Sequence, residues 1–129
     1  MNTAMLNPRE HLVLIADDDP DVRMLISTAL DRDGYNVIEA RDGQEAIDLI
    51  GEQEPALALL DVNMPRLDGV QVAERLREEG SPVPFIFVTA QTRRAELNRI
   101  LATNPTGYIP KPIPLQKLRD QVRAALVAG

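Results

Sequence analysis

Short apolar stretches alternate with longer helix-like segments along most of this chain. A short apolar stretch bounded by turn residues is typical of a buried β-strand, whereas apolar residues at helical spacing indicate an amphipathic helix. Strands are predicted at Leu12–Ala16, Asn36–Glu39, Ala56–Leu60, Val83–Val88 and Gly107–Ile109. Helices are predicted to begin near Pro20, Gly43, Asp68, Thr92 and Pro114. This alternation favours βα units around a parallel sheet, which is an α/β fold.

The first predicted helix has the clearest signals. Asp19 is a favourable N-cap residue, and Pro20 suits the first helical position. Gly34 stands just past the expected end of the helix, where glycine is common. Met24 lies off the apolar stripe and is predicted to be exposed. The stripe is predicted to be buried and consists of Val22, Leu25, Ile26 and Ala29.

Polar residues stand at the ends of four of the predicted strands. Asp17 and Asp18 follow the first strand, Asp61 follows the third and Thr89 follows the fourth. Lys111 comes after the fifth strand, with one proline between them. In an open parallel sheet the carboxyl ends of the strands meet at a crevice that binds ligands. The sequence therefore predicts a site that combines carboxylates, a hydroxyl and an amine.

These side chains suit a magnesium site that contains a reactive aspartate. Two carboxylates about 4 Å apart repel by roughly 4 kcal/mol at an effective dielectric constant near 20. A divalent cation removes this cost, and Mg2+ prefers a few carboxylates together with waters and phosphate oxygens. An aspartate such as Asp61 can act as a nucleophile and form an acyl phosphate. Phosphoryl transfer mainly requires positioning and charge neutralisation, which Mg2+, Lys111 and the Thr89 hydroxyl can supply.

Composition narrows the other function classes. The chain has 129 residues, and 44% of them are hydrophobic, which fits a single domain. Its net charge of −6 argues against direct binding to nucleic acid or acidic membranes. It has no cysteine, and His11 is the only histidine, so thiolate or histidine metal sites and a Ser-His-Asp triad are not expected. No stretch has the features of a signal peptide or a membrane span. A cytoplasmic location is the resulting expectation.

Four motifs in order, LVLIADDDP, LLDVNMPRLDG, FVTA and YIPKP, give the chain a resemblance to a known family. It resembles the receiver domain of bacterial two-component response regulators from about Leu12 to Val127. Residues 1–10 are interpreted as a short lead and residues 11–129 as the receiver domain. The resemblance implies a flavodoxin-like, doubly wound sheet of five parallel strands in the order 2-1-3-4-5, with five helices.

The same resemblance assigns the chemistry of the acidic cluster. Asp61 would be the phosphoacceptor. Asp18 and Asp61 would bind Mg2+ directly, and Asp17 would bind it directly or through water. The backbone carbonyl of Asn63 would complete the protein ligands.

Further residues would sense the phosphoryl group. Thr89 would donate a hydrogen bond to a phosphoryl oxygen, and Lys111 would pair with that group or, before phosphorylation, with Asp61. Tyr108 would be the aromatic residue of the switch. Asn63 and Gln91 would tune access of the water that removes the phosphoryl group, and their polar side chains predict decay that is not unusually slow. The family also usually has a cis bond at the position of Lys111–Pro112, so a cis bond is predicted here.

The implied function is a phosphorylation switch in a phosphorelay. A sensor histidine kinase or a phosphotransfer protein would phosphorylate Asp61. It would dock over the first helix and the Pro112-Ile113-Pro114 loop, where Met24 and Ile113 are predicted to be exposed. The surface of the fourth helix, fifth strand and fifth helix would then contact an effector protein or effector domain. The chain would catalyse only its own phosphotransfer and dephosphorylation. The kinase, the pathway, the output and the oligomeric state are left open, as is whether the receiver is part of a longer regulator.

Three alternatives have different discriminating features. A magnesium-dependent phosphatase with an aspartate nucleophile would need a second aspartate two residues later, where this chain has Asn63. A flavodoxin-like cofactor carrier would need a phosphate-binding loop after the first strand, where the acidic residues Asp17 to Asp19 would repel a phosphate. A pseudo-receiver would serve only as an interaction module and would not become phosphorylated. Taken singly, the acidic triplet would be an N-cap and a solvated turn, Thr89 a strand-end hydroxyl, and Lys111 a loop lysine.

Two departures from the family concern the backbone. Asn104-Pro105-Thr106 replaces a common Gly-Ala pair, and asparagine is expected to keep the turn because it tolerates the left-handed conformation. Pro110 removes a backbone donor from the fifth strand, which an edge strand tolerates.

Overall fold

A computed structural model describes residues 11–128 of the chain. The strands are β1 (Leu12–Ala16), β2 (Asn36–Ala40), β3 (Leu57–Leu60), β4 (Phe85–Thr89) and β5 (Gly107–Pro110). The helices are α1 (Pro20–Arg32), α2 (Gly43–Gln53), α3 (Gly69–Glu78), α4 (Arg94–Ala102) and α5 (Leu115–Ala128). Strands and helices alternate as the hydrophobic pattern predicts, and the boundaries shift by no more than two residues. The expected lead at residues 1–10 lies outside the described residues.

The strands form one parallel sheet in the order β2-β1-β3-β4-β5, which confirms the predicted topology. β1 and β3 are neighbours in the middle of the sheet, and β2 and β5 are its edges. Pro110 therefore lies at the end of an edge strand, where the loss of its backbone donor is tolerated. Because all strands run the same way, the residues that follow β1, β3, β4 and β5 lie at the carboxyl ends of the strands, which together form the carboxyl edge of the sheet.

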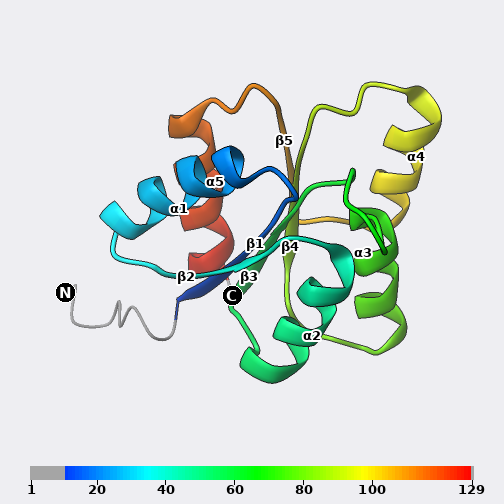
Figure 1. The fold of residues 1–129 in the computed structure, drawn as a ribbon, viewed down its shortest axis with the longest axis horizontal. Coiled ribbons are helices and arrows are strands. Elements are labelled where there is room, and N and C mark those ends of the chain that lie inside the picture. Colours follow the sequence, from blue (N-terminus) through cyan, green and yellow to red (C-terminus); the bar gives the residue numbers. More distant parts are fainter. Residues whose placement is uncertain (1–10, 129) are drawn as a thin grey trace.

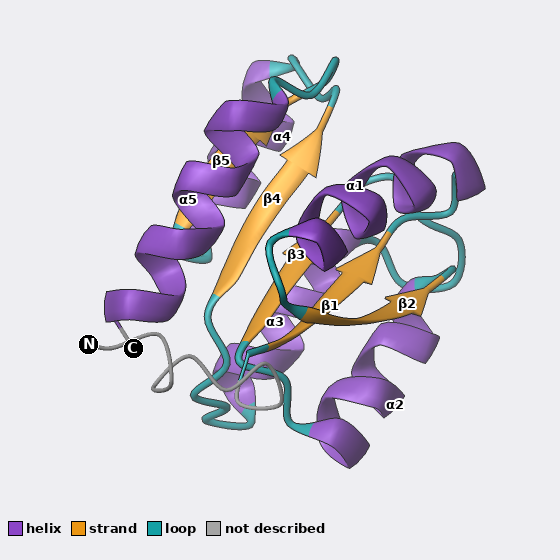
Figure 2. Ribbon diagram, turned by 90° about the vertical axis from the view of Figure 1, so that its left-hand side faces the viewer, coloured by secondary structure: helices purple, strands orange, loops and turns teal. Residues whose placement is uncertain are grey.

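Helices cover both faces of the sheet (Figures 1 and 2). Leu14, Leu60 and Phe87 point to the face covered by α2, α3 and α4, where they join Ile50, Leu76 and Ile100. Alternate residues point to the other face and pack with apolar side chains of α1 and α5, including Ile26, Leu30, Leu118 and Val122. β1, β3 and β4 are almost wholly buried, so the strand ends that carry the polar residues are anchored in a packed core.

The first helix confirms most of its predicted features but not the whole stripe. Asp19 caps the helix by accepting a hydrogen bond from the Asp21 N–H. Met24 is 67% exposed, as predicted, whereas Leu25 is 44% exposed, so its predicted burial was wrong. Ile26 and Leu30 are the fully buried pair, because residues four apart lie on one face of a helix and this face meets the sheet.

The turns that end α1 and α4 use left-handed residues. Gly34 has φ of 92° after α1, and Asn104 has φ of 55° after α4, as predicted for both turns. Arg77 of α3 fastens the end of α4, because its guanidinium donates to the carbonyls of Thr103 (3.0 Å) and Asn104 (2.7 Å). Among residues 11–128, no helix has the combination of length and apolar character that crossing a membrane requires.

Candidate functional site

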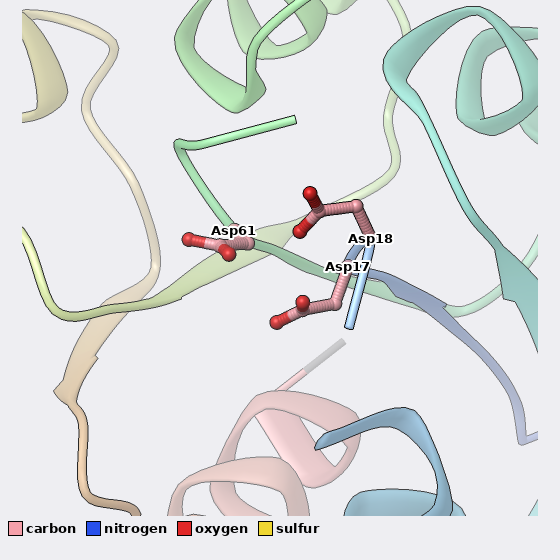
Figure 3. Close-up of side chains that lie close together, drawn as sticks. All are labelled: Asp17, Asp18 and Asp61. Atoms are coloured by element: carbon pink, nitrogen blue, oxygen red, sulfur yellow. The ribbon is translucent and has the colours of Figure 1, made fainter. Parts of the chain in front are cut away.

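Three carboxylates from neighbouring strands meet at the carboxyl edge of the sheet. Asp17 and Asp18 follow β1 and Asp61 follows β3, and the Asp61 N–H donates to the carbonyl of Ala16 at 2.9 Å. One carboxylate oxygen from each aspartate lies within 4.8 Å of the others. Figure 3 shows the three side chains gathered in one place. The acidic cluster predicted from the sequence is therefore present, and is defined here as Asp17, Asp18 and Asp61.

The three carboxylates differ in burial. Asp17 is 2% exposed and Asp61 is 5% exposed, whereas Asp18 is exposed at the mouth of the cluster. Burial raises the pKa of Asp17 above its ordinary value, and hydrogen bonds from Lys111 and from the Asp19 N–H oppose that rise only in part. Folding thus disfavours the charged form of Asp17. A cation bound at this cluster would offset that cost.

Lys111 bridges the two buried carboxylates. Its Nζ donates to Asp17 Oδ2 at 2.8 Å and to Asp61 Oδ2 at 3.0 Å, and its side chain is 19% exposed. Burial opposes its charge, yet the two hydrogen bonds and the nearby carboxylates raise the pKa of this amine. Lys111 is therefore charged at neutral pH. The bond between Lys111 and Pro112 is cis, as predicted.

Thr89 and Tyr108 are linked through the backbone of Gln91. The Gln91 N–H donates to Thr89 Oγ1 at 3.3 Å, and the Tyr108 hydroxyl donates to the Gln91 carbonyl at 2.8 Å. Thr89 is fully buried at the end of β4, and Tyr108 is half-buried against the core on the side of α2, α3 and α4. Within residues 11–128, no acceptor is found for the Thr89 hydroxyl proton, so this proton can be donated to a ligand.

The loop after Asp61 is held close to the cluster. Asn63 is exposed at its rim, and its N–H donates to Asp61 Oδ1 at 3.3 Å. Gly69 packs so closely that a Cβ there would overlap the Asp61 carbonyl, and the Gly69 N–H donates to the carbonyl of Val62 at 3.0 Å. The start of α3 therefore fixes the backbone on which Asp61 stands.

The oxygen donors of this site fit Mg2+. Hard cations prefer carboxylate oxygens, and Mg2+ typically takes one or two protein carboxylates and leaves other positions to water and phosphate. Asp18 and Asp61 can serve in this way, and in residues 11–128 no hydrogen bond occupies the Asp18 carboxylate. The net charge of the cluster with Lys111 is also negative, which favours a cation.

Sequence reasoning missed several supporting residues. Arg23 of α1 donates to the carbonyl of Asp17, and Arg99 of α4 lies 3.5 Å from the Asp68 carboxylate that caps α3. The contact of Gly69 with Asp61 was also missed, although the Asp68-Gly69 pair is a turn signal. No local sequence pattern indicates the arginine contacts, because tertiary packing determines their partners.

Comparisons with known proteins agree with this geometry. The sequence model of the response regulator receiver domain family matches residues 13–123. The response regulator MprA of Mycolicibacterium vanbaalenii is 40% identical over 114 residues, which cover 88% of this chain and 49% of that protein. The MprA protein of Mycobacterium avium is also 40% identical over 114 residues, covering 88% of this chain and 50% of that protein. The chain thus spans about half the length of the curated relatives it matches.

Solved structures give the same result. The receiver domain of the Francisella response regulator 1452 superposes with a TM-score of 0.85 at 28% identity, covering 92% of this chain and 98% of that one. The chemotaxis protein CheY4 of Vibrio cholerae superposes with a TM-score of 0.82 at 27% identity, covering 90% of this chain and 98% of that one.

Proposed function

We propose that this chain, which belongs to the response regulator receiver domain family, is a phosphorylation switch that accepts a phosphoryl group on Asp61. One observation carries the proposal: two buried carboxylates and one exposed carboxylate meet beside a charged lysine at the carboxyl edge of the sheet. A receiver domain is a module of two-component signalling, so the donor we propose is a sensor histidine kinase or a phosphotransfer protein. A cytoplasmic location belongs to the same proposal.

The proposal includes Mg2+ held by Asp18, Asp61 and the backbone carbonyl of Asn63, with Asp17 binding directly or through water. When bound, Mg2+ neutralises the charge that develops on the phosphoryl oxygens. Asp17 also accepts a hydrogen bond from Lys111 on Oδ2, so this aspartate positions the lysine as well as the cation. The acidic cluster therefore combines metal binding with placement of Lys111.

The transfer step follows from the positions of Asp61, Lys111 and Thr89. A carboxylate oxygen of Asp61 attacks the phosphorus of phosphohistidine, and a P–O bond forms while the P–N bond breaks. The electron pair of that bond leaves with the imidazole nitrogen, and Asp61 becomes an acyl phosphate. Lys111, 3.0 Å from Asp61 Oδ2, is placed to follow the negative charge onto a phosphoryl oxygen. The free proton of Thr89 is available to another phosphoryl oxygen.

Loss of the phosphoryl group completes the cycle. Water attacks the phosphorus, the bond to Asp61 breaks, and inorganic phosphate leaves while the carboxylate is restored. Asn63 is exposed at the rim and Gln91 is half-buried beside Thr89, so both are placed to orient or admit that water. We propose that these polar side chains allow decay that is not unusually slow, and that the chain catalyses only its own transfer and hydrolysis.

The response to phosphorylation is proposed to run through Gln91. Thr89 accepts a hydrogen bond from the Gln91 N–H, so movement of Thr89 toward the phosphoryl group would displace the Gln91 backbone. The Tyr108 hydroxyl donates to the Gln91 carbonyl and would respond to that displacement. Tyr108 is already half-buried, so its expected inward turn starts from a position against the core. The surface of α4, β5 and α5 would then shift between two populations and contact an effector.

Hydrogen exchange tests this switch. After treatment with Mg2+ and acetyl phosphate, we expect amide exchange to change in α4 and β5, because the Thr89–Gln91–Tyr108 link leads to them. The Thr89→Ala variant should take up the phosphoryl group more slowly but, once phosphorylated, should show a much smaller change in exchange. Identical exchange in phosphorylated and unphosphorylated native protein would refute the switch.

The kinase docking surface needs one correction. Ile113 was predicted to be exposed, but it is half-buried because it packs against the core beneath α1 and α5. Met24, Leu25 and Leu115 supply the exposed apolar surface instead, with exposed fractions of 67%, 44% and 38%. They line one concave surface between α1 and the start of α5, and the pocket that it forms has a volume of about 440 Å³. We propose this surface as the docking site of the phosphodonor protein.

Charge substitutions test the docking surface. The Met24→Glu/Leu25→Glu variant is expected to slow phosphotransfer from a phosphorylated partner kinase by about 10-fold or more, since burying an unpaired charge in an apolar contact is costly. Its phosphorylation by acetyl phosphate should match that of native protein. Leu101→Glu is the matched control, because Leu101 is 64% exposed but stands on α4. Equal slowing with both donors would exclude a docking role.

A further inference from the structure

Arg23 holds the loop that carries two members of the acidic cluster. Its Nη1 donates to the backbone carbonyl of Asp17 at 2.7 Å, and its Nε donates to Glu39 Oε1 of β2 at 3.1 Å. The Arg23 side chain is 12% exposed, compared with 43% for Glu39. A planar guanidinium can make both hydrogen bonds at once, and these bonds fix the orientation of the group when it is buried. Arg23 thus connects the Asp17 backbone to α1 and to the edge of the sheet.

The contacts of Asp17 and Asp18 are unequal. Three hydrogen bonds hold Asp17. Its N–H donates to the Ala40 carbonyl at 3.1 Å. Its Oδ1 accepts from the Asp19 N–H at 2.9 Å, and its Oδ2 accepts from Lys111 Nζ at 2.8 Å. The Asp18 carboxylate is exposed and has no hydrogen bond from residues 11–128. Its position therefore depends on the peptide plane between Asp17 and Asp18. The carbonyl of that plane is the group that Arg23 binds.

We propose that Arg23 is a positioning residue for the cation site, because it orients the peptide that presents Asp18 to Mg2+. This inference rests on the proposed function, which includes Mg2+ binding at the same cluster. Arg23 carries a positive charge near a cation site, and Glu39 compensates that charge at 3.1 Å. The contribution of Arg23 is therefore one of geometry. Outer residues that orient metal ligands commonly change metal affinity by about 10- to 100-fold when they are replaced.

The sign of the effect separates geometry from charge. Removing a positive charge near an acidic site should strengthen Mg2+ binding if charge alone matters. Freeing the peptide before Asp18 should weaken Mg2+ binding, because the ligand must then be ordered when the cation binds. A role in fold stability alone would lower the melting temperature without changing the dissociation constant for Mg2+.

Thermal unfolding in a series of MgCl2 concentrations measures that constant without phosphorylation. We expect the Mg2+ dissociation constant of Arg23→Ala to be about tenfold larger than that of native protein. Arg23→Lys keeps the charge but lacks the planar fork, and its constant should also increase, by less. Arg32→Ala is the matched control: it removes the same charge from an exposed position at the end of α1 and should leave the constant unchanged.

The outcomes are distinguishable. Native protein that binds Mg2+, with equal or tighter binding by both Arg23 variants, would overturn the positioning role and leave the proposed function intact. Native protein whose melting temperature does not respond to MgCl2 would overturn both. If Arg23→Ala does not fold without Mg2+, the comparison of Arg23→Lys with native protein decides the question.

Discussion

The Lys111→Met variant is expected to accept phosphoryl groups from acetyl phosphate about 100-fold more slowly than native protein. The Lys111 amine lies 3.0 Å from Asp61 Oδ2 and 2.8 Å from Asp17 Oδ2, so it is placed to stabilise the charge of the transferred group. Preorganised charges of this kind act mainly on the transition state. The rate should be measured at saturating Mg2+, from the increase in intact mass with time.

The same variant is expected to be less stable without Mg2+. Loss of the amine leaves the buried carboxylates of Asp17 and Asp61 without their shared cation, which should lower the free energy of unfolding by roughly 1–3 kcal/mol. Saturating Mg2+ should restore part of this loss, because it supplies positive charge to the same oxygens. Lys117→Met is the matched control, since Lys117 is the only other lysine and is exposed on α5. Unchanged rate and stability in Lys111→Met would show that the bridge has neither role.

The parts of the fold that depend on short-range patterns were predictable from the sequence. Five apolar stretches separated by helical segments gave the strands and helices, since burial on both faces demands continuous apolar strands. Asp19 and Gly34 marked the start and the end of α1, and Asn104 was expected to keep the turn before β5, because these roles depend on local backbone geometry. The strand order was supplied by the family resemblance.

Features that depend on tertiary packing could not be predicted. Leu25 fits the apolar stripe of α1 but lies at its margin, and only the position of the sheet decides that it is exposed. Ile113 is half-buried because it packs against the core cluster that includes side chains of α1 and α5, and nothing in the Pro112-Ile113-Pro114 loop indicates this contact. The bond from Arg23 to the Asp17 carbonyl requires the loop, the helix and the neighbouring strand to be placed first.

The gathering of the acidic cluster had a different basis. Asp17, Asp18 and Asp61 could be predicted to meet because all of them follow strands of a parallel sheet. The difference in burial among the three aspartates could not be predicted. Asp17 and Asp61 are buried and paired with Lys111, whereas Asp18 is exposed.

The Asp61→Asn variant is expected to take up no phosphoryl group and to remain folded. Asparagine has nearly the same shape and keeps one oxygen, which can still accept the hydrogen bond that Lys111 Nζ donates to Asp61 Oδ2. It removes one of three negative charges whose oxygens lie within 4.8 Å, so the metal-free fold should not lose stability through repulsion. An amide is a poor nucleophile, so the reaction with acetyl phosphate should stop. A melting curve of the variant checks that the loss is chemical.

Intact mass after incubation with Mg2+ and acetyl phosphate is the most direct test of the proposed function. Native protein is predicted to gain the mass of one phosphoryl group, and this gain should be absent without Mg2+ and absent in Asp61→Asn. The same gain in Asp61→Asn would place the acceptor elsewhere. No gain in native protein, with either this donor or a phosphorylated kinase, would contradict the account and leave a domain that signals by binding alone.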